Sequence, residues 1–202
     1  MKVLKEIYPA IAMTIVLTII LGIIYPMVVT GIAQVMFPTK AGGSLIEKGG
    51  RVIGSSLIGQ PFTGAGYFHS RPSAAGSGYD ATASAGSNLG PTSQKLMDNV
   101  KTAAQSLQEE NPESPVPVDL VTASASGLDP HITPAAAEFQ VARIARERGL
   151  SLDQVRRLVS EHTEGRQFTL LGEPRVNVLE LNLDLDALKP MSDATMLRSE
   201  RK

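Results

Sequence analysis

The sequence predicts an α+β soluble domain attached to one N-terminal transmembrane helix. Two observations carry this prediction. No charged residue occurs between Glu6 and Lys40, and the residues after Lys40 combine helix-spaced apolar stripes with shorter stretches in which apolar and polar residues alternate. The roughly 160 residues that follow the apolar run are enough for one domain with its own core.

The apolar run is long enough to cross a bilayer as a helix. A hydrocarbon core needs about 20 apolar residues, and residues 10–36 exceed that length. A secretory signal peptide would have an apolar region of about 7–15 residues and a small-x-small cleavage site, and a helix buried in a soluble core is rarely this long and uncharged. We therefore predict a retained transmembrane helix over residues 7–37, kinked at Pro26.

The flanking charges predict the orientation of this helix. Lys2 and Lys5 precede it, whereas Lys40, Lys48 and Arg51 follow it at lower density. Because positive charge favours the cytoplasmic side, residues 1–6 are expected to be a short cytoplasmic head and residues 40–188 an extracytoplasmic domain. The expected localisation is the cell (inner) membrane, as a single-pass protein.

Small residues are scattered along the predicted helix. They allow another membrane helix to approach closely, or they belong to an ordinary lipid-facing anchor, and the sequence leaves both readings open. These residues are Ala12, Thr14, Thr18, Gly22, Gly31 and Ala33.

Three helices are predicted in the domain. Residues 91–110 carry an amphipathic stripe and open with Pro91, which suits a first helical turn. Residues 134–148 follow the N-cap candidate Thr133 and end at Gly149. A further helix begins after Ser151, which forms a capping box with Gln154.

Two strands and a tail complete the predicted domain. Residues 51–58 hold apolar side chains around small polar ones, and residues 175–185 alternate strongly, with a phase slip at Leu179–Glu180 that suggests a bulge. Residues 189–202 are polar and lack a pattern, so they are expected to be disordered.

The composition excludes several classes of function. The formal charge is -1, which argues against nucleic acid as the main partner, since phosphate neutralisation needs a basic surface. There is no cysteine, which excludes disulfides and thiolate metal sites.

Few motifs point to chemistry. Residues 86–93, GSNLGPTS, precede a helix as a phosphate loop would, but the Lys of a Walker motif is missing and Pro91 lacks an N–H, so a tight turn is favoured. Asp129 and His131 suggest a metal pair or a general base, but no second His has ligand spacing, so Asp129 before Pro130 is read as a turn former. No metal site and no catalytic residue is predicted.

An arginine cluster on the second and third predicted helices is interleaved with acidic residues. This pattern is typical of a solvated, salt-bridged face, and polyanion binding is the minor reading. The arginines are Arg143, Arg146, Arg148, Arg156 and Arg157.

The stretch over residues 66–93 is rich in Gly, Ser and Ala, like a flexible linker. It nevertheless contains Tyr67, Phe68 and Tyr79, and disordered linkers are poor in aromatic residues. We therefore predict an ordered, loop-rich surface whose small side chains permit close approach by another chain.

Three long phrases resemble the C subunit of the Kdp potassium-transporting ATPase. They are YFHSRPSAAGSGYDATASAGSNLGPTS, DLVTASASGLDPHITPAAAEFQVARIARERGL and LLGEPRVNVLELNLDL. The resemblance runs from the N-terminal helix to about Leu188, and only the polar tail falls outside it.

The resemblance implies a function that the residues alone do not. Kdp is similar to a P-type pump joined to a potassium-channel-like subunit, and its C subunit is a single-span, non-catalytic accessory protein needed for assembly. It has been regarded as a catalytic chaperone that raises the affinity of the ATP-hydrolysing subunit for ATP. The implied partners are the channel-like subunit, the ATP-hydrolysing subunit and membrane lipid. No cofactor is expected, and ATP would act through the complex.

The small-residue stretch and residues 124–132 are the expected contact with the channel-like subunit. The candidate interface residues are Tyr67, Phe68, Arg71, Tyr79, Asn88, Asp129 and His131. Two alternatives remain: a regulatory subunit that binds nucleotide directly, with Gln140 as the candidate contact, and an anchored extracytoplasmic enzyme that uses Asp129 and His131. An extracytoplasmic domain could not touch cytoplasmic ATP, so the predicted orientation favours coupling through the membrane helix.

Overall fold

A computed structural model gives the structure of the chain, and residues 2–190 are described, with side chains from residue 5. The chain divides into two compact units between Ser55 and Ser56. The first holds one helix long and apolar enough to span a membrane, and the second is a mixed helix and sheet domain, so the predicted fold class is confirmed. The predicted tail lies, from residue 191 on, outside the described residues.

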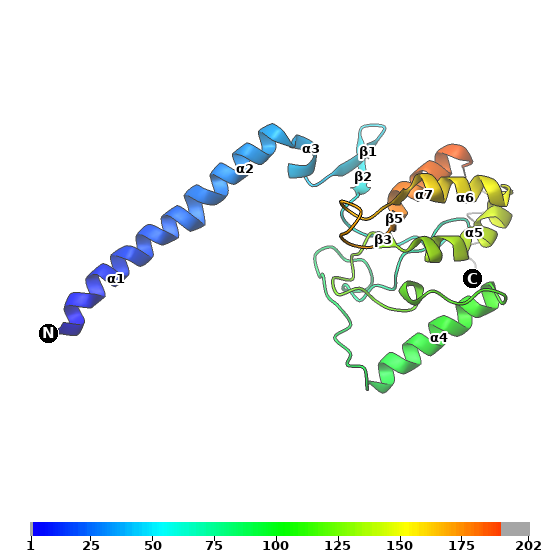
Figure 1. Ribbon diagram of the computed structural model, residues 1–202, viewed down its shortest axis with the longest axis horizontal. Coiled ribbons are helices and arrows are strands. Elements are labelled where there is room, and N and C mark those ends of the chain that lie inside the picture. The colour runs from blue at the N-terminus through cyan, green and yellow to red at the C-terminus, as the bar shows by residue number, and fades with distance from the viewer. Residues whose placement is uncertain (1, 191–202) are drawn as a thin grey trace. The chain divides into compact units, whose positions relative to one another are not determined.

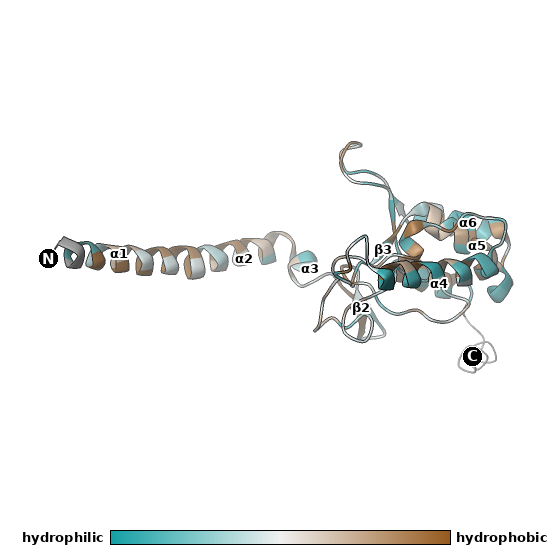
Figure 2. Cartoon of the chain, turned by 90° about the horizontal axis from the view of Figure 1, so that it is seen from below, coloured by the Kyte–Doolittle hydropathy of each residue, from teal (hydrophilic) through white to brown (hydrophobic). Residues whose placement is uncertain are grey.

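The candidate membrane span covers Lys5–Met36, 32 residues. It consists of α1 (Lys2–Ile19), a π-helical turn η1 (Ile20–Ile24) and α2 (Tyr25–Met36), which Figure 1 draws as one long blue helix. Brown, hydrophobic residues recur along its length in Figure 2. The irregular turn lies directly before Pro26, whose ring removes an N–H from the helical ladder. The irregular turn ends two residues before Pro26, and the kink at Pro26 stays a prediction.

A short helix and a hairpin complete the first unit. Helix α3 (Pro38–Ala41) leads into β1 (Leu45–Lys48) and β2 (Arg51–Ser55), which pair antiparallel. Gly49 and Gly50 form the turn with positive φ angles of 60° and 77°. The predicted strand over residues 51–58 is confirmed for its first five residues.

In its described residues the second unit contains four α-helices and a small sheet of order β3-β5-β4 with antiparallel pairs, and α5 and α7 contact β5. Its elements are α4 (Gln94–Glu110), the 3-10 turn η2 (Val118–Leu120), β3 (His131–Ile132), α5 (Pro134–Arg148), α6 (Leu152–Glu161), β4 (Thr163–Glu164), β5 (Arg175–Asn177) and α7 (Val178–Leu188). Helices α5, α6 and α7 lie next to one another (Figure 1).

The capping signals of α5 and α6 are confirmed. Thr133 accepts a hydrogen bond from the backbone N–H of Ala136, and Gly149 ends α5 in the left-handed conformation. Ser151 and Gln154 form the reciprocal capping box at the start of α6. The predicted helix over residues 91–110 is present as α4, but it begins at Gln94, so Pro91 lies before its first turn.

The predicted strand over residues 175–185 is wrong beyond Asn177. Only three residues pair as β5, and the chain then turns into α7. The Asn177 side chain accepts a hydrogen bond from the N–H of Glu180 at 3.2 Å and so caps the helix. Val178, Leu181 and Leu185 are buried at spacings of three and four, which places them on one helical face. The phase slip at Leu179–Glu180 lies where the spacing of the apolar residues changes from that of a strand to that of a helix.

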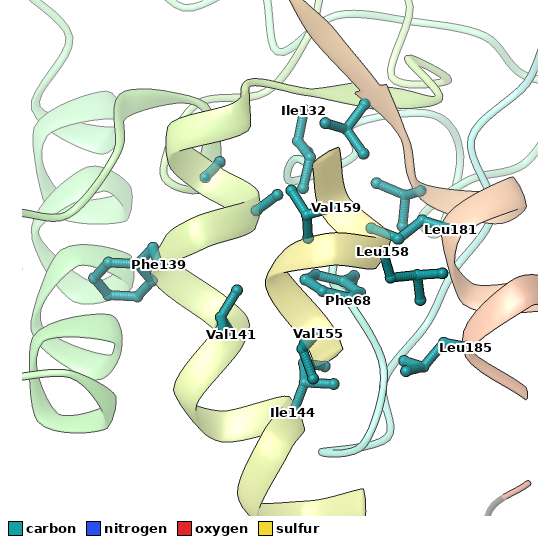
Figure 3. Close-up of a cluster of buried hydrophobic side chains, with 14 of the residues drawn as sticks. Phe68, Ile132, Phe139, Val141, Ile144, Val155, Leu158, Val159, Leu181 and Leu185 are labelled. Atoms are coloured by element: carbon teal, nitrogen blue, oxygen red, sulfur yellow. The ribbon is translucent and has the colours of Figure 1, made fainter. Parts of the chain in front are cut away.

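The core lies between α5, α6 and α7 and is completed by a side chain from the small-residue stretch. Phe68 is fully buried against these helices (Figure 3). Val141, Ile144 and Val155 come from the predicted apolar stripes and are 1 % exposed or less. Burial of such side chains contributes roughly 1.5–3 kcal/mol each, so these stripe positions are a substantial part of the packing.

Candidate functional site

The small-residue stretch is attached to the helices through residues 65–69. Within the described part of the chain no strand pairs with this segment. Instead, the side chain of Asn182 on α7 pairs with the backbone of Phe68. The N–H of Phe68 donates to Asn182 Oδ1 at 2.9 Å, and Asn182 Nδ2 donates to the Phe68 carbonyl at 2.9 Å. One amide side chain thus supplies what a neighbouring strand would supply.

Gln140 on α5 makes the same reciprocal pair with the next residue. The N–H of His69 donates to Gln140 Oε1 at 2.8 Å, and Gln140 Nε2 donates to the His69 carbonyl at 3.1 Å. Gln140 Nε2 also donates to the Ala136 carbonyl, and Arg143 Nη2 donates to Gln140 Oε1. A glutamine amide has two donors and two acceptor positions, so all are used inside the chain, and the residue is 1 % exposed. In this conformation Gln140 has no capacity left for a nucleotide.

Two buried arginines bind the carbonyls that precede Phe68. Arg143 Nη1 donates to the carbonyls of Ala65 and Tyr67, and Arg148 Nε donates to the Gly66 carbonyl at 2.6 Å. Their charges are balanced by Glu110, 2.6 Å from Arg143 Nε, and by Asp186, 2.8 Å from Arg148 Nη1. 

The predicted solvated face is therefore wrong for two of its arginines. Arg143 and Arg148 are 7 % and 4 % exposed, because loop carbonyls cover them and need donors. Arg146 and Arg156 are exposed, as that prediction requires, and pair with Glu147 and Glu138.

The aromatic candidates Tyr67 and Phe68 belong to this attachment. Phe68 is a core residue with no exposed surface. The Tyr67 hydroxyl donates to Asp186 Oδ2 at 3.2 Å, and the Arg148 guanidinium lies 4.7 Å from the centroid of the Tyr67 ring. Burial, together with the neighbouring Asp186 carboxylate, raises the pKa of Tyr67. The Tyr67 side chain therefore remains a neutral donor that helps to hold the loop.

Four other candidates meet where residues 71–79 approach residues 122–131. Arg71 Nη1 contacts Asp129 Oδ2 at 3.2 Å, and Arg71 Nε donates to the Thr122 carbonyl at 3.3 Å. The Tyr79 hydroxyl donates to the Arg71 carbonyl, and the N–H of His131 donates to Asp129 Oδ1 at 3.0 Å. Arg71 is thus a cross-link between the two loops predicted to form one surface.

The electrostatics of this cross-link favour an ionised Asp129. Burial acts to raise the pKa of Asp129, but hydrogen bonds from His131 and the Arg71 guanidinium hold it below its usual range. Burial raises the pKa of Tyr79 and lowers the pKa of His69, whose ring also lies near the positive charge of Arg143. Arg71, Asp129 and His131 line a surface cavity of about 320 Å³, together with residues of the β4–β5 connection.

The remaining loop contacts make the stretch an ordered surface. Ser73 Oγ donates to the Gly127 carbonyl at 2.6 Å, and the N–H of Ala85 donates to the Ser126 carbonyl at 3.0 Å. The predicted tight turn before α4 is present, with the N–H of Ser93 donating to the Gly90 carbonyl at 3.0 Å. Asn88 is exposed and has a φ of 52°.

Sequence reasoning missed the role of three residues that hold residues 65–69: Arg143, Arg148 and Asn182. A signal was available, because polar residues occupy stripe positions. Arg148 follows the buried Ile144 by four residues, and Asn182 precedes the buried Leu185 by three. A polar side chain on an apolar face must find a buried partner, but nothing local indicates which backbone it binds.

The fold and the site define a class of protein. It has one helix long and apolar enough to span a membrane, followed by an α+β domain with an ordered loop surface. The model of the family described as KdpC, the K+-transporting ATPase c chain, matches residues 7–187. The Potassium-transporting ATPase KdpC subunit of Koribacter versatilis is 63% identical over 187 residues, which cover 93% of this chain and 97% of that protein. The chain therefore belongs to the KdpC family.

Two further relatives carry the same name. The subunit of Rhodopseudomonas palustris (strain BisB18) is 56% identical over 198 residues, covering 92% of this chain and 100% of the relative. That of Methylococcus capsulatus is 59% identical over 184 residues, covering 90% and 97%. The similarity thus includes both the membrane span and the domain.

Proposed function

We propose that the chain is a non-catalytic accessory subunit of a potassium-transporting ATPase complex. It stabilises the assembly of a channel-like subunit with an ATP-hydrolysing subunit and supports the affinity of the latter for ATP. The observation that carries the proposal is the family match over residues 7–187, which includes the span and the whole α+β fold. The contacts of Arg71, Asp129 and Gln140 support it, because these polar groups hold loops together.

In this proposal residues 1–6 are cytoplasmic and the domain is extracytoplasmic in the inner membrane. An effect on ATP then passes through the membrane helix. One feature of the span supports helix contacts: Gly31 has no side chain, so the backbone of a partner helix can approach closely there.

Direct nucleotide binding is the alternative, and topology separates the two. The chain has no cysteine, so single cysteines at the exposed positions Ser77 and Ser160 report their side of the membrane. We expect both to react with a membrane-impermeant thiol reagent in intact cells, whose outer membrane has been permeabilised if one is present. Lysed cells are the control for accessibility. Reaction only after lysis would contradict the orientation and favour direct nucleotide contact.

The role in assembly is tested by leaving the chain out. The complex is purified through a tag on the ATP-hydrolysing subunit, with and without co-expression of this chain. Without it we expect recovery of the channel-like subunit to fall several-fold and the ATP concentration for half-maximal hydrolysis to rise. Re-expression of the full chain is the control. Equal recovery and equal ATP dependence in both preparations would contradict the proposed function.

A further inference from the structure

The connection between β4 and β5 contains an exposed apolar turn. Gln167 and Leu171 pair through two backbone hydrogen bonds of 2.9 Å and enclose residues 168–170. Phe168 is 89 % exposed, Leu170 77 % and Leu171 56 %. Three large apolar side chains therefore cluster on a hydrogen-bonded hairpin, which we call the apolar turn (residues 167–171).

The backbone of this turn does not suit the residues that form it. Phe168 and Thr169 have φ angles of 52° and 62°, a conformation that hairpins ordinarily fill with Asn, Asp or Gly. An aromatic and a β-branched residue are strained there. Since Phe168 is almost fully exposed, burial within the domain does not offset the strain. Backbone hydrogen bonds close the turn, but its aromatic side chain packs on nothing in the described part of the domain, and a strained, exposed aromatic residue points to an external contact.

The charges beneath the turn indicate what kind of molecule makes that contact. Arg166 donates to both oxygens of Glu173 at 2.8 Å and 2.7 Å, and Arg175 pairs with Glu164 at 2.9 Å. The two arginines and two glutamates of residues 163–175 cancel. A loop that binds an anionic lipid surface combines apolar residues with excess positive charge, and that excess is missing here.

An apolar centre with a polar, charge-balanced rim is the organisation of a protein interface. We propose that Phe168, Leu170 and Leu171 insert into an apolar pocket on another subunit of the ATPase complex, on the same side of the membrane as the domain. The rim of that pocket is polar and carries little net charge. This inference rests on the proposed function, because it requires the chain to be part of the complex.

The test exchanges the strained residues for those that the turn prefers. In the Phe168→Asn/Thr169→Gly variant of the full chain, relief of strain should leave the urea midpoint unchanged or higher. Loss of the aromatic contact should lower recovery with the other subunits roughly tenfold. Met97→Asn, on the exposed face of α4, is the matched control and should leave recovery unchanged. A gain in stability with a loss of assembly is a combination that a purely structural role would not produce.

The outcomes separate this inference from the function on which it rests. If the turn variant assembles normally while omission of the whole chain disrupts the complex, the inference fails and the proposed function stands. If omission has no effect, both fail. 

A bilayer contact is tested separately. An environment-sensitive dye on Phe168→Cys should report water when the chain alone is in liposomes, and a blue shift should appear in the assembled complex. A blue shift in liposomes without the other subunits would assign the apolar turn to lipid and overturn the proposal.

Discussion

Asn182→Leu should lower the free energy of unfolding by about 2–6 kcal/mol. Leucine has the same branching at Cγ and is larger than asparagine, so the change removes the hydrogen bonds without opening a cavity. The N–H and the carbonyl of Phe68 both lose their partner, and each buried polar group left unpaired costs about 1–3 kcal/mol. Urea unfolding of the full chain in detergent, followed by circular dichroism, measures the difference.

The matched control for this change is Asn99→Leu on the exposed face of α4. Substitutions at such positions usually change stability by no more than about 0.5 kcal/mol. Equal losses in the two variants would show that Asn182 contributes nothing beyond a polar side chain on a helix. The attachment of residues 65–69 would then have to depend on the arginines and Gln140.

Gly127→Ala should destabilise the domain by about 2–5 kcal/mol, because the new β-carbon strains the backbone and clashes with neighbouring backbone atoms. Gly127 has a φ of 66°, where an L-residue costs about 1–2 kcal/mol. A β-carbon there would lie 2.6 Å from the Ala75 nitrogen and 2.6 Å from the Ala85 carbonyl oxygen. Both are backbone atoms, so the two loops must separate, and overpacking adds about 1–3 kcal/mol. The measurement is the same urea titration.

Gly165→Ala is the control for the second change. No atom lies within 4 Å of its built β-carbon and its φ is outside the left-handed region, so we expect a change below about 1 kcal/mol. If Gly127→Ala unfolds at the same urea concentration as the unchanged chain, the close approach of residues 75 and 85 to residue 127 is not required for stability.

The parts of the fold that the sequence predicted correctly are those with local signals. Thr133, Gly149 and Ser151 mark the ends of α5 and α6, and each acts through atoms no more than four residues away. Residues 178–185 were mistaken for part of the predicted strand because their apolar positions fit a period of two almost as well as a period of 3.6. The N-cap at Asn177 was the local feature that distinguished the two.

The candidate surface was predicted only in part, for a physical reason. Composition shows that residues 66–93 contain too many aromatics for a linker, but it does not show what holds them. The partners are 71 residues away for His69 and Gln140, and 114 residues away for Phe68 and Asn182. These hydrogen bonds join a loop without periodicity to helical positions that look like core, so no spacing rule connects them.

The attachment of residues 65–69 also determines which substitutions the domain tolerates. In a sheet any residue except proline can extend the ladder, because backbone pairs with backbone. Here the hydrogen-bonding groups that receive the segment are side chains of α5 and α7. Specific side chains are therefore required on the helices, whereas the loop contributes mainly backbone groups to these hydrogen bonds. The segment also offers no open ladder to a neighbouring molecule, so it lacks the exposed strand edge at which β-proteins aggregate.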